Sequence, residues 1–258
     1  MIYAVWLAGF GLLFVVLERL WPRYPDQPLF RRGILSDVGY VVFNSHYLGV
    51  VVALALREVW PMSGLGRFEL GLFAKTGFWT QFFAGFLMLD FLQWCVHNLL
   101  HRAPFLWEFH KVHHSIVDMD WIGNWRIHWA EILVYRSLLY VPLAVMGFAG
   151  PVMFWIGVLN TLAGHFAHAN VRWRIGPLRY LINSPELHIW HHTHPESGPP
   201  DRNFALTLAI WDWMFGTWYL PDRDPERLGF EGIERYPAQL PGQWWAPFRR
   251  LLKTEPPR

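Results

Sequence analysis

The sequence has very little cysteine and little charge for its length of 258 residues. Its single cysteine, Cys95, cannot form an internal disulfide and cannot by itself hold an iron–sulfur cluster. The C-x-x-C-H segment that attaches haem covalently is absent as well. Any metal or redox chemistry in this chain must therefore use ligands other than cysteine.

Charged residues make up 16% of the chain, compared with roughly 25% in soluble domains. The net charge of +2 is small and the basic residues are scattered, which excludes nucleic acid as a partner. Hydrophobic residues make up 53% of the sequence, with 17 tryptophans and 20 phenylalanines. This composition is typical of a protein embedded in a lipid bilayer.

Long apolar segments predict five membrane-spanning helices, or four if one segment only re-enters the bilayer. The first segment lacks the basic residues and the small-residue cleavage site of a signal peptide, so it is expected to be an anchor helix. The distribution of lysine and arginine favours an N-terminus outside and histidine-rich segments facing the cytoplasm. The expected spans cover about residues 2–17, 38–59 and 78–100, and two more between 132 and 166 that divide near Gly150 and Pro151.

No linker separates two cores, so the sequence predicts one domain over residues 1–258. Its three parts are N-terminal transmembrane helices over about 1–77, a histidine-rich catalytic core over 78–217, and a cytoplasmic tail over 218–258. From about Val171 the chain is rich in proline and charge, and short helices and loops are expected there. The predicted fold class is all-α: an integral-membrane helical bundle under a cytoplasmic helical cap.

Most of the 13 histidines fall into four groups with helical spacing. Residues three or four positions apart lie on one helix face, about 5–6 Å apart at Cβ, so their rings can converge. In H-x-x-H-H the outer histidine shares a face with both members of the doublet, so the motif offers imidazoles to two neighbouring points. The groups are "HNLLH" from His97, "HKVHH" from His110, "HFAH" from His165 and "HIWHH" from His188.

Three interpretations of these groups compete. Ordinary core histidines satisfied by hydrogen bonds would be costly, since each buried polar group without a partner costs about 1–3 kcal/mol. A bis-histidine haem protein needs single histidines at facing depths rather than clusters. Metal binding is favoured, because neutral imidazole suits Zn, Cu, Fe or Ni. A single zinc uses three or four protein ligands, so this number of histidines predicts two ions.

The histidine groups, with the segments around them, resemble the fatty acid hydroxylase / sterol desaturase superfamily of integral-membrane di-iron enzymes. The resemblance runs from about Asp90 to Thr217. It implies a histidine-rich di-iron centre on the cytoplasmic face, above helices that bring a lipid substrate to it. Its elements are Asp90 before "HNLLH", then "LWEFHKVHHS", "NWRIHWAE", "HFAHAN", "NSPELHIWHH" and "WDWMFGT".

The resemblance also implies roles for individual residues. Asp90, His128 and Glu131 are expected close to the metals, where a carboxylate can accept a hydrogen bond from the free N–H of a ligand. Trp129 stands where many relatives have proline, and the position of His165 varies in the family. The implied metal ligands are His97, His101, His110, His113, His114, His165, His168, His188, His191 and His192.

Several polar residues are expected to have structural roles. His194 is expected in a loop, and His46 is expected to pack within a span or to line the substrate route. Cys95 is expected to point away from the metals. Asp201 and Asp212 are expected to fix the cap, with Asn170 and Asn183 as further polar contacts.

The expected reaction is hydroxylation of an unactivated C–H bond of a lipid by O2 at two irons. Desaturation, demethylation and ether cleavage remain open, as does the choice among sterol-like, acyl and ether lipids. The chain has no G-x-G-x-x-G segment and no flavin or haem motif, so electrons must come from an external donor. A zinc hydrolase is the main alternative, although no H-E-x-x-H is present. A metal transporter or store is less favoured, since transport sites lie near the bilayer midplane.

Overall fold

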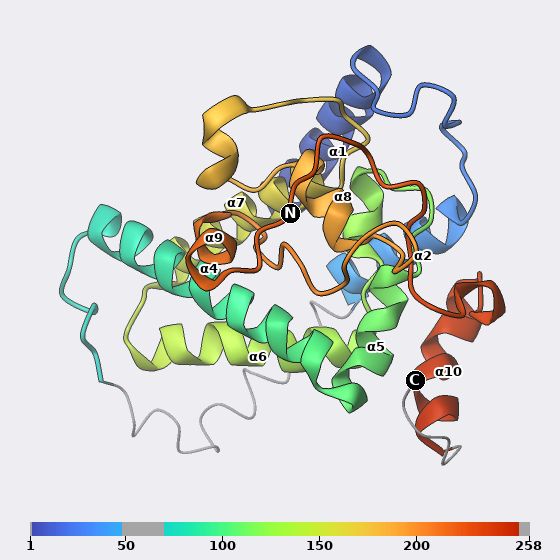
Figure 1. Cartoon of the computed structure of the whole chain (residues 1–258). Coiled ribbons are helices and arrows are strands. Elements are labelled where there is room, and N and C mark those ends of the chain that lie inside the picture. The colour runs from blue at the N-terminus through green and yellow to red at the C-terminus, as the bar shows by residue number, and fades with distance from the viewer. Residues whose placement is uncertain (1, 48–69, 253–258) are drawn as a thin grey trace.

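The computed structural model describes residues 2–47 and 70–252, and Figure 1 shows their arrangement. Within these ranges the chain is helical and has no β-strand, only two isolated bridges between loop residues. The prediction of an all-α fold is therefore confirmed. The elements are α1 (Ile2–Leu20), α2 (Ile34–Val42), η1 (Phe43–Tyr47), α4 (Phe78–Arg102), α5 (Pro104–His114), η3 (Trp121–Trp125), α6 (Trp129–Val145), α7 (Gly150–His168), η4 (Gly176–Tyr180), α8 (Pro185–His191), α9 (Ile210–Phe215), η5 (Ile233–Arg235) and α10 (Leu240–Leu252).

Helix α4 is long and apolar enough to cross a membrane, and it is the one helix of the described residues that meets both criteria. Its 25 residues extend about 38 Å at 1.5 Å per residue. Helices α1, α6 and α7 have 19, 17 and 19 residues. The span expected over 38–59 lies mostly outside the described residues. The break expected at Gly150 falls where α7 begins, with Pro151 in its first turn, a position that proline favours.

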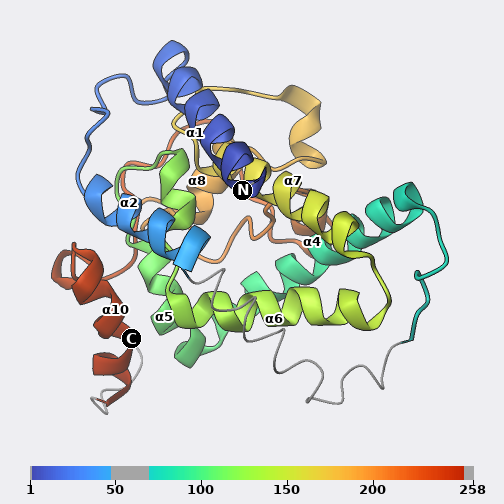
Figure 2. The same cartoon turned by 180° about the vertical axis from the view of Figure 1, so that it is seen from behind.

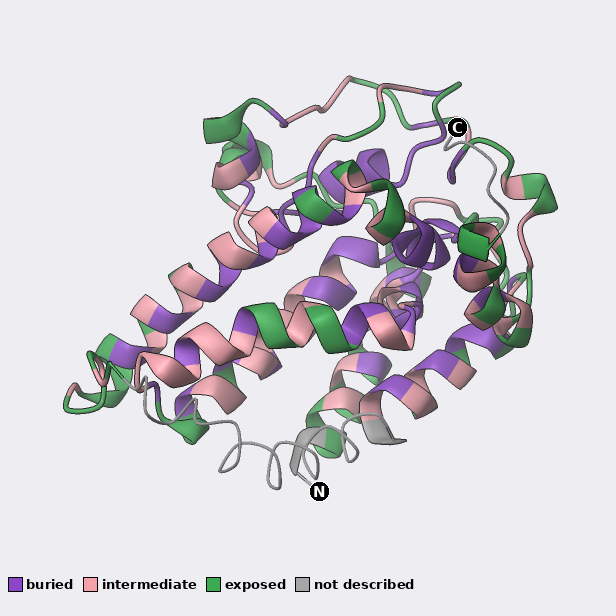
Figure 3. Cartoon of the chain, turned by 90° about the horizontal axis from the view of Figure 1, so that it is seen from below, coloured by how far each residue is buried: buried purple, intermediate pink, exposed green. Residues whose placement is uncertain are grey.

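An apolar core joins α4, α6 and α7, and α4 packs against both other helices. Figures 1 and 2 show α4 running beside α6. Leu89, Val96 and Leu100 lie seven and four positions apart, so they share one face of α4. Gly85 permits the close approach of α7, because a Cβ there would lie 3.0 Å from the side chain of Ile156. Figure 3 shows the resulting pattern, in which buried residues recur along the long helices between intermediate and exposed ones.

Above one end of these helices, α5, η3, α8 and α9 form a cap. Helix α4 ends at Arg102 because Ala103 is extended and Pro104 opens α5, as expected for a residue before proline. The cap has an apolar core of its own, formed by Ile116, Met119, Ile189, Trp190 and Leu228. This core fixes the end of α5 against α8, the two helices that carry the H-x-x-H-H segments.

A buried network of two arginines and two aspartates holds α2 against the cap. The guanidinium of Arg31 donates to Asp37 at 2.8 Å and also to both carboxylate oxygens of Asp120. Arg126 donates to Asp37 at 2.8 Å and to the carbonyl oxygen of Ser115 at 3.0 Å. Because opposite charges are paired and hydrogen-bonded, burial of the four groups is tolerated. The network fixes the segment that follows α5.

Candidate metal centre

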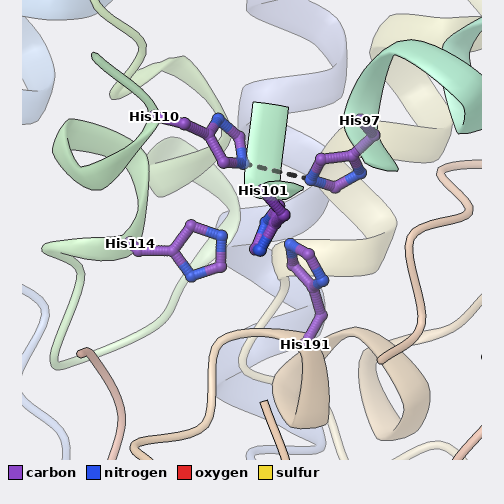
Figure 4. Close-up of side chains that lie close together, drawn as sticks. All are labelled: His97, His101, His110, His114 and His191. Atoms are coloured by element: carbon purple, nitrogen blue, oxygen red, sulfur yellow. Dashed lines mark hydrogen bonds between the residues drawn. The ribbon is translucent and has the colours of Figure 1, made fainter. Parts of the chain in front are cut away.

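Nine histidines converge in two adjoining groups. Group A contains His97, His101, His110, His114 and His191, and group B contains His113, His168, His188 and His192. Within each group, one ring nitrogen of every histidine lies within 4.8 Å of those of the others. Figure 4 shows the five rings of group A pointing toward a common centre from three helices.

The local helical geometry explains how two groups form from so few segments. On α5, His110 and His114 are one turn apart and face group A, while His113 points into group B. On α8, His191 enters group A, while His188 and His192 enter group B. Each H-x-x-H-H segment therefore serves two neighbouring points, as its spacing predicted.

In most of these histidines, the ring nitrogen that points away from the centre of its group, the outer nitrogen, forms a hydrogen bond with the protein. In group A, the Nδ1–H of His97 donates to the carbonyl oxygen of Phe204 at 2.6 Å, and that of His191 donates to Arg202 at 2.8 Å. His110 donates from Nδ1 to Glu131 at 2.8 Å. A neutral imidazole that donates from Nδ1 carries a bare lone pair on Nε2. These rings therefore present acceptors to the centre of the group.

The same arrangement in group B brings three Nε2 atoms together. His113 and His168 donate from Nδ1 to backbone carbonyl oxygens at 3.3 and 2.8 Å. The Nε2 of His168 nevertheless lies 3.1 Å from the Nε2 of both His113 and His188. Facing lone pairs repel one another unless a cation or a proton lies between them. For His113 and His168, whose Nδ1 atoms already donate, a proton between the Nε2 atoms would require a buried imidazolium, which loss of hydration disfavours.

A metal ion fits these distances. At metal–nitrogen distances of about 2.0–2.1 Å and angles of about 90–109°, two ligating nitrogens lie about 2.8–3.4 Å apart. The Nε2 atoms of His97 and His110, 3.1 Å apart, fall in this range. The buried Nε2 atoms of His101, His114 and His191 have no other partner within the described chain. The donor set therefore fits a metal in each group.

Electrostatics favours the same conclusion. Burial, followed by the neighbouring imidazoles, holds the pKa of His113, His114, His188 and His192 well below the ordinary value of 6.5. Burial lowers the pKa of His191 to about 3. These rings are therefore neutral at physiological pH, and neutral imidazole is the form that binds metal.

His165 lies outside both groups. Its Nδ1 is 3.1 Å from the side-chain nitrogen of Asn124, and its ring packs beside Phe14 and Trp121. Gly164 makes room for this contact, because a Cβ there would lie 2.6 Å from the Asn124 oxygen. The structure thus brings nine of the ten implied ligands together and places the tenth one turn away on α7.

The three residues expected to support the metals have different surroundings. Glu131 accepts from His110, a member of group A. Asp90 instead accepts from the backbone N–H of Leu208 and the indole N–H of Trp211, and so fixes the segment around α9. His128 accepts from Ala130 N–H as the N-cap of α6, and its Nε2 donates to the carbonyl oxygen of Trp244.

The loop over residues 201–204 supplies contacts that the sequence did not reveal. Asp201, expected only to fix the cap, accepts from His101 Nδ1 at 3.0 Å. Together with the carbonyls of Arg202 and Phe204, it gives three histidines of group A their outer acceptors. Backbone carbonyls leave no trace in a sequence, although the positive φ angle of Asp201, 58°, is of a kind that aspartate tolerates.

Asp212 holds this loop in place, as expected for a residue that fixes the cap. Its carboxylate accepts from the backbone N–H groups of Phe204 and Ala205, both at 2.8 Å. It also accepts from the Thr217 hydroxyl and the Trp94 indole. The "WDWMFGT" segment thus acts on the metal centre through the loop.

The remaining polar candidates lie outside both groups. Asn170 pairs with the backbone of Tyr24, and Asn183 donates to the carbonyl oxygens of Ala205 and Leu206. His194 is buried in a loop and accepts from Glu196 N–H. Cys95 is half-buried on α4, and the side chain of His46 lies outside the described residues.

A cavity of about 570 Å³ leads to the histidines from between α4, α6 and α7. Five members of the two groups line it: His97, His110, His113, His168 and His188. Most of the remaining wall is apolar, with Ile132, Leu139, Met153 and Phe154 among its residues. A long apolar molecule can therefore reach both groups from the side of the long helices.

The helical fold and the two groups of buried imidazoles together define a class: an all-helical protein with a histidine-rich centre able to hold two metal ions. The chain belongs to the fatty acid hydroxylase family, whose profile matches residues 82–217, just over half of its length. The match covers all nine histidines of the two groups.

Three relatives indicate the range of the family. Ornithine lipid hydroxylase OlsE of Rhizobium tropici is 32% identical over 82% of this chain and 65% of its own. Alkylglycerol monooxygenase of Homo sapiens is 31% identical over 54% of this chain and 30% of its own. Methylsterol monooxygenase 1-1 of Arabidopsis thaliana is 26% identical over 82% of this chain and 73% of its own. The chain thus spans less than two thirds of the first two relatives. No solved structure matches it.

Proposed function

We propose that this protein is a membrane-bound lipid hydroxylase in which groups A and B each hold one iron. The relatives named above are hydroxylases and monooxygenases of lipids, which supports a lipid substrate. Two ferrous ions would supply the activation of O2 that attack on an unactivated C–H bond requires.

The protein's own residues orient the ligands and exclude water. Glu131, Asp201 and the carbonyl of Phe204 hold the Nδ1–H groups of three ligands, which keeps each Nε2 lone pair directed inward. The cavity admits an apolar chain beside His97, His110 and His113. Its mostly apolar wall keeps bulk water away from the reaction, which suppresses competing hydrolysis and proton leakage.

The membrane arrangement is also proposed. Helices α1, α4, α6 and α7 would span the bilayer, with the N-terminus outside and the cap in the cytoplasm. The chain carries no nucleotide or flavin motif. Electrons would therefore come from an external donor protein or a diffusible reductant that approaches the cap.

The observation that carries the proposal is the 3.1 Å approach of imidazole Nε2 atoms whose Nδ1 atoms are already donating. The test is metal analysis of the purified protein, combined with mass spectrometry of lipids from cells with and without the gene, grown under ¹⁸O2. About two irons per chain and a lipid that gains one labelled oxygen are expected. Two tightly bound zincs with activity under anaerobic conditions would replace this proposal with a zinc hydrolase.

A further inference from the structure

One charged residue of the cavity has no role in the metal centre. Arg136 lies on α6, seven residues or about 10 Å beyond its first residue, Trp129, and lines the cavity between α6 and α7. Arginine within a membrane-spanning helix is costly, and it marks a binding or transport site where a partner compensates the charge. The charge of Arg136 must therefore be compensated either by another residue of the protein or by a bound ligand.

The described part of the chain provides none. Glu131 is the only carboxylate among the cavity-lining residues, and it accepts from His110. The ion pairs of the described chain involve other arginines, and Arg136 donates no hydrogen bond within it. Among the described residues, the positive charge of Arg136 thus has no compensating partner in a wall that is otherwise mostly apolar.

Other polar groups line the same cavity. Asn160 on α7 has a buried side-chain oxygen without a partner in the described chain. Ser137 and Tyr140 lie one and four positions after Arg136, and Tyr140 reaches toward α7, where a Cβ at Gly157 would lie 3.5 Å from its hydroxyl oxygen. The cavity thus combines one cation and several polar groups with an apolar wall that extends to the histidines.

We propose that Arg136 binds the acidic group, a carboxylate or a phosphate, of the lipid that occupies this cavity. A guanidinium matches both anions with paired hydrogen bonds, and the attraction is stronger where water is scarce. If the proposed hydroxylation is correct, the substrate is an acidic or zwitterionic lipid rather than a neutral sterol or alcohol.

The position of Arg136 also locates the reacting carbon. Arg136 lies five residues beyond Glu131, the partner of His110, a rise of about 7.5 Å along α6. An extended lipid anchored at Arg136 therefore passes the histidines with carbons close to its acidic group.

The test compares ligands of equal chain length on the purified full-length protein in a non-ionic detergent. Binding of hexadecanoate, hexadecyl phosphate and hexadecanol is measured with radiolabelled probes. At least one anionic probe is expected to bind about tenfold or more tightly than hexadecanol. Arg136→Gln abolishes this preference without changing hexadecanol binding, and Arg136→Lys retains much of it. The anion that is preferred identifies the acidic group.

The control is Arg174→Gln, which removes an exposed arginine outside the cavity and should leave the preference intact. Equal binding of all three probes by the wild type would overturn the proposal. So would an equal loss of all three in Arg136→Gln, or loss of the preference in Arg174→Gln. Because binding needs no turnover, Arg136-dependent anion binding would stand even if the metal analysis and the ¹⁸O2 experiment contradicted the proposed hydroxylation.

Discussion

At the scale of single residues, the metal centre depends on which nitrogen of each imidazole carries the proton. Carbonyl and carboxylate oxygens around the centre can only accept, so they fix the proton on Nδ1 and leave Nε2 free to bind metal. His97, His110 and His191 all follow this rule. The outer acceptors thus determine the binding form of the ligands before a metal arrives.

Groups A and B share no histidine, so single substitutions should remove one metal at a time. His114→Ala is expected to lose the ion of group A, and His192→Ala that of group B, since each loses an inward-facing ligand. Each variant should retain about one iron per chain, measured by elemental analysis, and should lose hydroxylation. His194→Ala, which removes a buried histidine outside both groups, should retain both ions. Loss of both ions in either ligand variant would contradict two separable sites.

Glu131 should control metal affinity through His110. Glu131→Ala removes the acceptor of the His110 Nδ1–H. Metal affinity should fall about 10- to 100-fold, as it does when other hydrogen-bond acceptors of metal-ligating histidines are removed. Competition with a chelator measures this change. Glu131→Gln keeps an oxygen acceptor, so its metal affinity should lie between those of the alanine variant and the wild type. The exposed Glu231→Gln is the control, and an effect there as large as in Glu131→Ala would refute the assignment.

The histidine spacings were informative at this scale, because side chains three or four positions apart must share a helix face. They predicted both the convergence and its division between two points. The outer acceptors were less accessible. Glu131 was found because it is a carboxylate near a histidine segment, whereas Asp201 and the carbonyls of Arg202 and Phe204 act through loop geometry that has no periodicity.

At the scale of elements, the centre is assembled from helix ends. His97 and His101 close α4, His168 closes α7, and the H-x-x-H-H segments close α5 and α8. The position of each helix end is therefore a condition for metal binding. Two contacts between elements, the Asp37 network and the His128 cap, permit separate tests of this dependence.

The buried network around Asp37 should stabilise both the fold and group B. Asp37→Ala leaves Arg31 and Arg126 without a shared partner, and breaking a buried pair in this way costs about 3–5 kcal/mol of unfolding free energy. Arg126 also accepts from His113 through its carbonyl oxygen, so group B should lose metal before group A. Thermal unfolding in detergent and iron content measure the two effects. Asp26→Ala, at an exposed position, should change neither.

His128 should contribute to stability without holding a metal. His128→Ala removes the N-cap of α6, which should cost about 1 kcal/mol, and also the contact with Trp244 on α10. Thermal unfolding should shift downward while iron content stays at the wild-type value. His128→Asn keeps a capping oxygen and should recover part of the loss. Loss of iron from both variants would place His128 among the ligands.

At the scale of the whole molecule, folding and metal binding should be coupled. Without metal, the inward Nε2 lone pairs of His113 and His168 face one another in a buried site. A ligand present at about 1,000 times its Kd stabilises a fold by about 4 kcal/mol, so chelation should lower the melting temperature and iron should restore it. A variant that carries both His114→Ala and His192→Ala should respond much less. An equal response would show that the chelator acts elsewhere.

The long apolar segments were enough to predict an all-α chain, because segments of this length with helical spacing allow few alternatives to helices. The helix expected over 78–100 is present as Phe78–Arg102. The cavity and the position of Arg136 on its wall were not predicted, because they depend on how α6 and α7 pack. Hydropathy describes single segments, and a cavity is a property of the space between them.

The order of the ligands along the chain has a consequence for synthesis. Four of the five members of group A, His97, His101, His110 and His114, leave the ribosome within a stretch of eighteen residues, and only His191 comes later. Group B begins with His113 alone and must wait for α7 and α8. If each group holds one ion, as proposed, a nascent chain can capture its first ion early, and the second can bind only after the cap has closed.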